Sequence, residues 1–223
     1  VHDDYGYDTI VGIQNRLGSH DTQRRASMVE NPTHRRDKGA NLKSNPAYSV
    51  APPASDEAKA RLRQMVAFQF LMPGAPFIYY GDEVGMWGAD DPDCRKPMLW
   101  PDLKYEAEVA TPFPGRSRDR TPVEVAPDLE RLKFYQQLCK LRAEHEVLRR
   151  GDFRFLPIKN ESRLVAFERY SHDRKHSCVV FFNAGSGPVE LPVDPIGERQ
   201  PAGLSSGFAD GVLGSSGFAI FID

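Results

Sequence analysis

The sequence has few cysteines, no long uninterrupted apolar run and almost no net charge. Its 223 residues contain 3 cysteines, and 29 Lys and Arg nearly balance 31 Asp and Glu, for a formal net charge of −2. Three scattered thiols are too few for a disulfide framework or a zinc knuckle, so Cys94, Cys139 and Cys178 are predicted to be ordinary thiols. The charge balance argues against a nucleic-acid-binding protein, because phosphate groups are bound by Lys and Arg clustered on one face.

Two short basic runs and one histidine pair could suggest binding sites. The runs His34–Lys38 and Arg116–Arg120 are interpreted as solvated loops. His172 and His176 have a spacing found in metal sites, but the turn-forming residues between them predict a hairpin tip instead. No metal site is therefore predicted and no cofactor is required, although the sequence leaves calcium binding open.

The longest apolar stretch, Met65–Tyr80, is interrupted by Gln69 and by three Pro or Gly residues. It therefore does not supply the roughly 20 apolar residues of a membrane span. No secretory leader pattern is visible at the start. Because the first residue is Val1 rather than Met, we expect the mature or cleaved part of something longer. The N-terminus leaves the localisation of this soluble chain undetermined, whether cytoplasmic, periplasmic or secreted.

Helical and buried-strand patterns alternate up to Gly151. Ser55 is a good N-cap, and apolar residues at helical spacing follow it until Pro73–Gly74 ends the helix. The apolar run Ala75–Tyr80 predicts a parallel strand buried on both faces. A second helix is predicted to begin at Pro127 and to end at Gly151.

After Gly151 the apolar pattern changes to a period of two, which is typical of strands. Strands are predicted within Phe153–Ile158, Arg163–Tyr170, Ser177–Asn183 and Gly217–Ile222. The sequence thus predicts an α/β domain over residues 1–150 and an antiparallel β-sandwich over residues 151–223. The polar stretch Asn31–Pro53 is expected to be a surface or active-site loop.

Two runs of residues carry the candidate chemistry. The first is Ser19-His20-Asp21-Thr22-x-Arg24; the second begins at Tyr80-Gly81-Asp82-Glu83 and continues through Trp87 to Asp90-Asp91-Pro92-Asp93-Cys94-Arg95-Lys96. Each is a short apolar or small-residue stretch that breaks into a polar, Gly-rich loop with carboxylates beside a cation. The strand ends of a β/α barrel present a sugar-binding site in this way.

These runs resemble the alpha-amylase family of glycoside hydrolases, family thirteen, and within it the neopullulanase, cyclomaltodextrinase and maltogenic amylase group. The first run resembles the histidine-aspartate motif that follows the seventh strand of a (β/α)8 TIM barrel. Ala75–Tyr80 resembles the eighth strand, and Gly88–Met98 is similar to the oligosaccharide-contacting loop of that group. The resemblance implies the last two barrel strands and helices or so, followed by the C-terminal β domain. It implies α-glucan oligosaccharides and the rest of the barrel as partners, and leaves a homo-oligomer open.

The resemblance also implies roles for residues of the first run. Asp21 would be the carboxylate that stabilises the transition state by binding ring hydroxyls, and His20 would bind the same sugar. Arg24 is placed with the substrate-binding residues, where it could orient a neighbouring carboxylate.

In the second run, Asp91 and Arg95 are expected to contact a more distant sugar, although they could simply form a salt bridge. The ring of Trp87 is assigned to substrate binding, with packing as an equal alternative. Asp82 and Glu83 could be catalytic, but a structural role in fixing the loop is favoured.

The sequence lacks two motifs that the reaction needs. A retaining glycosidase uses one carboxylate as nucleophile and another as acid and base. The family's nucleophile lies in a Gly-x-Arg-x-Asp strand; the closest run, Thr33–Asp37, lacks the glycine. The resemblance implies that the complete protein hydrolyses α-glucans such as maltodextrins, cyclodextrins or pullulan with retention. Because both motifs are missing, this chain is predicted to be an inactive fragment. A transglycosylase, or a non-catalytic carbohydrate- or partner-binding protein on the same scaffold, remains an alternative.

Overall fold

The computed structural model describes residues 6–33, 39–45, 47–109, 121–158 and 163–223. The predicted loops His34–Lys38 and Arg116–Arg120 lie wholly outside these residues. The chain forms two compact units, which are described separately. Unit 1 comprises Val1–Asn15, Lys59–Phe77 and Gln136–Asp223, and unit 2 comprises Arg16–Ala58 and Ile78–Tyr135. The domain division at Gly151 stays a prediction.

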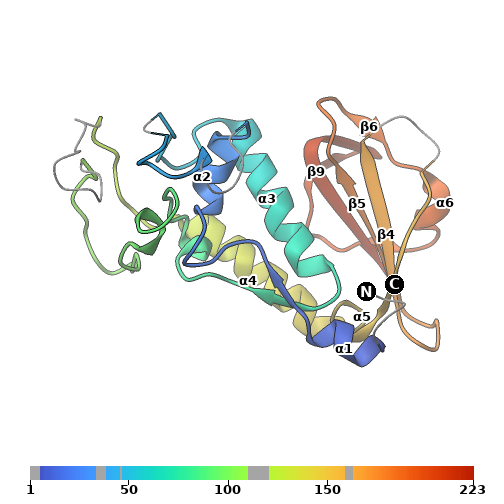
Figure 1. Ribbon diagram of the computed structural model, residues 1–223. Coiled ribbons are helices and arrows are strands. Elements are labelled where there is room, and N and C mark those ends of the chain that lie inside the picture. The colour runs from blue at the N-terminus through green and yellow to red at the C-terminus, as the bar shows by residue number, and fades with distance from the viewer. Residues whose placement is uncertain (1–5, 34–38, 46, 110–120, 159–162) are drawn as a thin grey trace. The chain divides into compact units, whose positions relative to one another are not determined.

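The first predicted helix is confirmed as α3, Asp56–Leu71 (Figure 1). The Ser55 hydroxyl accepts a hydrogen bond from the backbone N–H of Ala58 at 3.1 Å, as an N-cap should. Beyond the helix, Gly74 has a φ of 102°, and a Cβ there would lie 2.5 Å from the carbonyl oxygen of Ile13. The turn that ends α3 therefore requires glycine.

The second predicted helix is divided in two, which corrects the expectation of one continuous helix. Helix α4 spans Leu129–Glu144, and α5 spans Glu146–Arg150. His145 between them is extended, with φ −112° and ψ 106°. The Arg149 guanidinium donates to the carbonyl oxygens of Arg142 and Ala143, so a side chain stabilises the end of α4 where the break removes helical partners.

The predicted strand Ala75–Tyr80 is shorter and less buried than expected. Strand β2 spans only Ala75–Phe77 and pairs with β1, Gln14–Arg16, which follows the short helix α1, Tyr7–Gly12. Ala75 is exposed and Pro76 and Phe77 are half-buried, so the prediction of burial on both faces is wrong. Within the described part of the chain β2 has a single strand neighbour, and burial on both faces needs neighbours and covering layers on each side.

The C-terminal part of unit 1 is an antiparallel sheet. Its strands are β3 (Asp152–Phe155), β4 (Leu164–Tyr170), β5 (Ser177–Asn183), β6 (Val189–Glu190), β7 (Gln200–Pro201), β8 (Ser206–Ala209) and β9 (Val212–Ile222), with the short helix α6 (Val193–Ile196) after β6. The order is β3-β4-β5-β9-β6, and β7 and β8 also pair with β9. Four strands were expected; β9 begins earlier than expected, and β6, β7 and β8 were not predicted. The β4–β5 connection confirms the hairpin predicted at His172 and His176.

Both faces of this sheet are covered within unit 1. Leu164, Val179 and Phe221 belong to an apolar cluster against which side chains of β6, α6 and β8 pack. On the opposite face, α3 lies along the sheet in Figure 1, and the Phe68 ring is 5.4 Å from that of Phe182. Every residue of β5 is buried as a result. An antiparallel β part therefore follows the α/β elements, as predicted.

Unit 2 contains helix α2, Arg25–Glu30, and two 3-10 turns, η2 (Asp82–Val84) and η3 (Asp93–Arg95). The stretch Asn31–Pro53 has loop conformation where it is described, as predicted, but Tyr48 and Val50 in it are buried. The Asn31 side chain fixes this loop by donating to the Ser27 and Ser49 carbonyl oxygens, at 2.7 and 2.9 Å. The stretch is therefore packed onto α2 rather than fully solvated.

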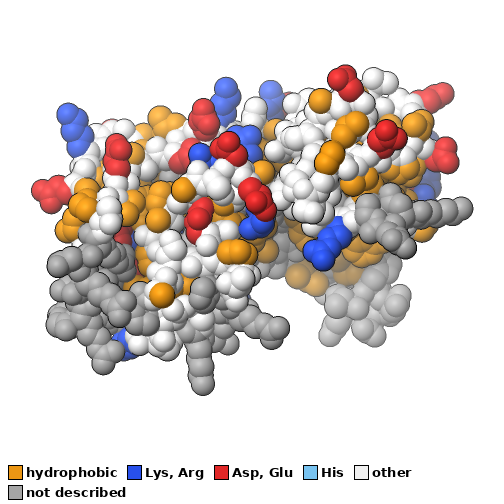
Figure 2. Space-filling model, turned by 90° about the horizontal axis from the view of Figure 1, so that it is seen from above, with side chains coloured by type: hydrophobic (Ala, Val, Ile, Leu, Met, Phe, Trp, Pro, Cys, Tyr) orange, Lys and Arg blue, Asp and Glu red, His pale blue; other side chains and the backbone are white. Residues whose placement is uncertain are grey.

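Two surface properties bear on the classes of protein considered above. On the face seen in Figure 2, the coloured Lys and Arg side chains are interspersed with Asp and Glu and form no basic cluster. Among the residues that the structure describes, no helix is both long and apolar enough to cross a membrane.

Candidate functional site

His20 and Asp21 lie in an exposed turn shortly after β1. The Thr22 hydroxyl accepts from the Ser19 N–H at 3.0 Å, and the Ser19 hydroxyl accepts from the Asp21 N–H at 3.2 Å. The His20 and Asp21 side chains are 62 and 67 % exposed, and His20 Nε2 is 3.1 Å from Asp21 Oδ2. The turn thus holds an imidazole and a carboxylate side by side, facing solvent.

Arg95 of η3 joins the two predicted runs although 74 positions separate it from Asp21. Its Nη2 lies 3.3 Å from Asp21 Oδ1, and its Nε lies 2.6 Å from Asp91 Oδ1. The same Nε donates to the His20 carbonyl oxygen at 3.1 Å. His20, Asp21, Asp91 and Arg95 therefore form one exposed polar cluster, called here the surface cluster.

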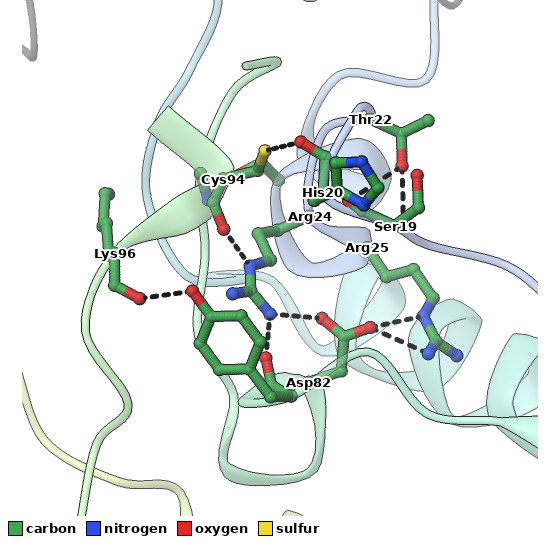
Figure 3. A network of polar contacts seen from close by, with 11 residues as sticks. Ser19, His20, Thr22, Arg24, Arg25, Asp82, Cys94 and Lys96 are labelled. Carbon is green, nitrogen blue, oxygen red and sulfur yellow. Dashed lines mark hydrogen bonds and ion pairs between the residues drawn. The ribbon is translucent and has the colours of Figure 1, made fainter. Parts of the chain in front are cut away.

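A buried layer lies beneath the surface cluster and consists of Arg24, Asp82 and Arg25, called here the buried triad (Figure 3). Arg24 Nη1 is 3.2 Å from Asp82 Oδ1, and Arg25 Nη2 is 2.8 Å from Asp82 Oδ2. Their side chains are at most 3 % exposed. Asp82 therefore has the structural environment expected of it, with each carboxylate oxygen facing an arginine.

Arg24 connects the buried triad to both loops. Its Nε donates to the Cys94 carbonyl oxygen at 2.8 Å, and its Nη1 donates to the Tyr80 carbonyl oxygen. Its guanidinium carbon lies 4.2 Å from the ring centroid of Tyr79 and 4.7 Å from that of Tyr80. These contacts engage Nε and Nη1 of Arg24, whereas its buried Nη2 has no hydrogen-bond partner among the described residues. Its assignment to substrate binding stays a prediction, and the alternative of orienting a neighbouring carboxylate matches its contact with Asp82.

Burial keeps two further groups neutral. Desolvation raises the pKa of Tyr79 to about 12 and raises the pKa of the Cys94 thiol. The neutral Cys94 thiol donates to the His20 carbonyl oxygen at 3.1 Å. That carbonyl therefore accepts from two consecutive residues of η3, Cys94 and Arg95.

Trp87 lies in the interior of the second loop. Its side chain is buried, and Lys96 Nζ lies 5.6 Å from its ring centroid. Lys96 also forms an ion pair of 2.8 Å with Glu108. This burial favours packing over stacking on a sugar, and the assignment of Trp87 to substrate binding stays a prediction. Next to it lies a pocket of about 510 Å³, lined among others by Met86, Trp87, Leu99, Tyr105 and Glu108.

Two features of this region were not found from the sequence. Arg25 was not singled out, since its partner Asp82 lies 57 positions away and nothing local marks Arg25 as buried. The Lys96–Glu108 pair was missed for the same reason. A weak signal existed for Arg25, because its neighbour Arg24 belonged to the first motif run. Among the described residues, no group of three or more His, Cys, Asp and Glu side chains could hold a metal ion.

The comparisons with known proteins agree with one another. A model of the alpha-amylase catalytic domain matches residues 11–151. Neopullulanase 2 of Thermoactinomyces vulgaris is 34 % identical over 187 residues, which cover 84 % of this chain and 24 % of that protein. Cyclomaltodextrinase of a Bacillus species is 35 % identical over 133 residues, 60 % of this chain and 20 % of that protein. The chain thus spans about a fifth to a quarter of the length of these relatives.

Solved structures give the same result. Maltogenic amylase from S. marinus superposes with a TM-score of 0.56 at 25 % identity, over 92 % of this chain and 22 % of that one. A debranching enzyme from Nostoc punctiforme has a TM-score of 0.56 at 19 % identity, over 97 and 35 % of the two chains, and shows the fold alone. Together with the domain match, these structures confirm the predicted fold class, the C-terminal part of a TIM barrel followed by an antiparallel β part.

Proposed function

The chain belongs to the alpha-amylase family, and from this premise we propose that it supplies part of the sugar-binding site of an enzyme that hydrolyses α-glucans such as maltodextrins, cyclodextrins or pullulan. One observation carries the proposal. Two runs of the sequence that resemble the family's sugar-contacting loops meet in the surface cluster, where Asp21 lies beside His20 and Arg95. A solvent-facing set of one carboxylate, one imidazole and one guanidinium offers acceptors and donors that match sugar hydroxyls.

Asp21 is the residue proposed to act on the transition state. Cleavage of a glycosidic bond develops positive charge on the sugar ring, and a carboxylate fixed beside the ring binds that charge more strongly than it binds the uncharged ground state. His20 and Arg95 each contact a different oxygen of Asp21 and limit the orientations of its carboxylate. His20 is proposed to bind the same sugar. Asp91 and Arg95, whose Oδ1 and Nε are 2.6 Å apart, are proposed to contact a sugar farther along the glucan.

The 223 residues contain neither of the family's two motifs that carry the nucleophile and the acid. The retaining reaction needs both carboxylates, one for the covalent intermediate and one for proton transfer. We therefore propose that the chain by itself binds α-glucans without cleaving them and needs the rest of the barrel for turnover. Reducing-sugar release from maltodextrin by the pure 223-residue chain, abolished by Asp21→Asn, would refute this part of the proposal.

The test of the catalytic role is Asp21→Asn in the protein as its gene encodes it. The amide keeps the size of the side chain but removes its charge. We expect kcat on maltotriose to fall about 10²-fold, which is about 3 kcal/mol of transition-state stabilisation, with a smaller change in KM. The thermal midpoint should stay the same, because the Asp21 side chain faces solvent. The control is Asp102→Asn, which changes an exposed carboxylate outside the surface cluster. It should leave kcat and the thermal midpoint unchanged.

Three outcomes would contradict the proposal. A large fall in the thermal midpoint with normal kcat would assign Asp21 a structural role. If the encoded protein binds maltodextrin but never cleaves or transfers it, the non-catalytic alternative is correct. Formation of longer oligosaccharides instead of reducing ends would identify a transglycosylase.

A further inference from the structure

The surface cluster depends on a contact that its own exposed side chains do not provide. Its ion pairs join groups that are 46 to 67 % exposed, and such pairs contribute only about 0 to 1 kcal/mol because water screens them. Ion pairs this weak add little to the hydrogen bond from Arg95 Nε to the His20 carbonyl oxygen in holding the two loops in one relative position. Further contacts that fix the backbone of the two loops lie in the buried layer below.

The fixing contacts run through Arg24. Its backbone N–H donates to the Gly88 carbonyl oxygen at 2.9 Å, and its Nε donates to the Cys94 carbonyl oxygen at 2.8 Å. Arg24 therefore holds the second loop at both ends of the segment Gly88–Cys94, which contains Asp91. From Cys94 the connection returns to the first loop, because the thiol donates to the His20 carbonyl oxygen. Figure 3 shows this path from Asp82 through Arg24 and Cys94 to His20.

Asp82 determines where the Arg24 guanidinium lies. A buried guanidinium needs a charge partner or several hydrogen-bond acceptors, and Asp82 Oδ1 at 3.2 Å supplies the charge. Arg25 shares the same carboxylate through Oδ2. Gly18, in the first loop, would place a Cβ 3.3 Å from Asp82 Oδ2, so the backbone of that loop also lies close to the carboxylate.

We propose that Arg24, held in place by Asp82, is a positioning residue that sets the relative position of the His20–Asp21 turn and the Gly88–Arg95 loop. The inference rests on the proposed function, since it concerns how Asp21 is aimed at the sugar. It assigns Arg24 an indirect role in catalysis, without contact with substrate. Arg25 donates to Asp82 Oδ2 and is assigned the role of stabilising the triad.

Two conservative variants of the encoded protein, Arg24→Lys and Arg25→Lys, form a matched pair. Both keep the positive charge next to Asp82 and both lose the planar fork of donors. Arg24→Lys also loses the bonds that Arg24 makes to the Cys94 and Tyr80 carbonyl oxygens. We expect Arg24→Lys to lower kcat on maltotriose about 10-fold or more with KM within about 3-fold, since misplacing a reacting group by about 1 Å can cost 10²-fold. Arg25→Lys should keep kcat within about 2-fold of the parent, although its thermal midpoint should fall about as much as that of Arg24→Lys.

Amide hydrogen exchange gives a second measurement that does not depend on activity. In Arg24→Lys, exchange should become faster at Thr22 and at Arg95 together, because both loops lose the same connection. In Arg25→Lys these two segments should exchange as in the parent. Equal losses of kcat in the two variants, or unchanged exchange in Arg24→Lys, would overturn the inference. If the parent protein does not act on any α-glucan, the proposed function fails and the exchange data alone decide the positioning role.

If Arg24→Lys does not fold, Cys94 provides another way to interrupt the path. Cys94→Ala removes the buried one of the two donors to the His20 carbonyl oxygen, keeps the Arg95 Nε donor and leaves the buried triad intact. We expect kcat to fall about 2- to 10-fold, the effect of one neutral hydrogen bond, and Cys94→Ser to restore it because a hydroxyl also donates. Unchanged kcat in the folded Ala variant would overturn the proposed path.

Discussion

Two buried arginines, Arg24 in unit 2 and Arg169 in unit 1, are stabilised by different kinds of partner. Arg24 lies against the Asp82 carboxylate. Arg169 donates to the carbonyl oxygens of Gly151, Leu71 and Leu148, at 2.7, 3.0 and 3.1 Å. Those carbonyls belong to the last residue of α3 and to the end of α5, where the helix dipole places partial negative charge. An arginine thus binds helix ends in unit 1, and another arginine binds a carboxylate in unit 2.

The difference suggests how structural and functional roles separate. Arg169 joins the ends of α3 and α5 to β4, all of them parts of the scaffold, through backbone carbonyl oxygens of buried residues. Arg24 joins two loops that carry the exposed side chains of the surface cluster. A cation that holds loops affects the geometry of what those loops present, whereas a cation that holds helix ends affects the stability of the fold.

Asp82→Asn should have the largest effect on stability. Removing the charge leaves two buried guanidinium groups facing a neutral amide, and breaking a buried ion pair in this way costs about 3 to 5 kcal/mol. The free energy of unfolding in urea measures it. The control is Glu144→Gln, which removes an exposed pair with Lys140 and should cost less than about 0.5 kcal/mol. Equal costs for the two variants would mean that the buried triad contributes no more than a surface pair.

Arg169→Met should have a smaller effect on stability and none on the chemistry. It removes the charge and the donors together, so the cost is that of buried carbonyls left without a partner, about 2 to 3 kcal/mol. Per folded molecule, kcat on maltotriose should stay within about 2-fold of the parent, because the contacts of Arg169 lie among scaffold elements. A fall in kcat as large as that of Arg24→Lys would remove the distinction between the two arginines.

Local sequence signals predicted the elements that depend on local chemistry. The Ser55 cap and the Pro73–Gly74 stop gave α3 to within about one residue, and short β-type runs bounded by turn residues gave β4 and β5. The strands β6, β7 and β8 have two to four residues each, too few for a period-two pattern, and Gly214 and Gly217 interrupt the pattern of β9. The break at His145 depends on Arg149 reaching back to α4, a tertiary contact that periodicity does not reveal.

The candidate site was predictable to a similar extent. The two motif runs identified His20, Asp21, Asp91 and Arg95, and the structure brings these four together. The sequence did not show which charged residues are buried. Burial of Arg24 and Arg25 follows from Asp82, which becomes their neighbour only when the two loops meet. Residue type and spacing predict chemistry, whereas exposure is a property of the folded chain.

Thiol reactivity should show the smallest effects, and it tests the difference between Arg24 and Arg169 at single positions near each of them. Cys139 is exposed, and Cys94 and Cys178 are buried, one in each unit. Burial raises the pKa of Cys178 to about 12 and also raises the pKa of Cys94, so neither forms much thiolate near neutral pH. Because the thiolate is the reactive form, both must be exposed by local opening before they react.

We expect iodoacetamide at pH 8, followed by peptide mass mapping, to label Cys139 first, Cys94 second and Cys178 last. Cys178 lies in β5 between β4 and β9, so its exposure requires the sheet to open, and it should react at least about 10-fold more slowly than Cys94. Arg24→Lys should accelerate labelling of Cys94 alone, because it loses the bond to the Cys94 carbonyl oxygen. Arg169→Met should accelerate labelling of Cys178 alone. If either variant accelerates both thiols equally, the two buried arginines stabilise one cooperative structure, and the separation of their roles would be wrong.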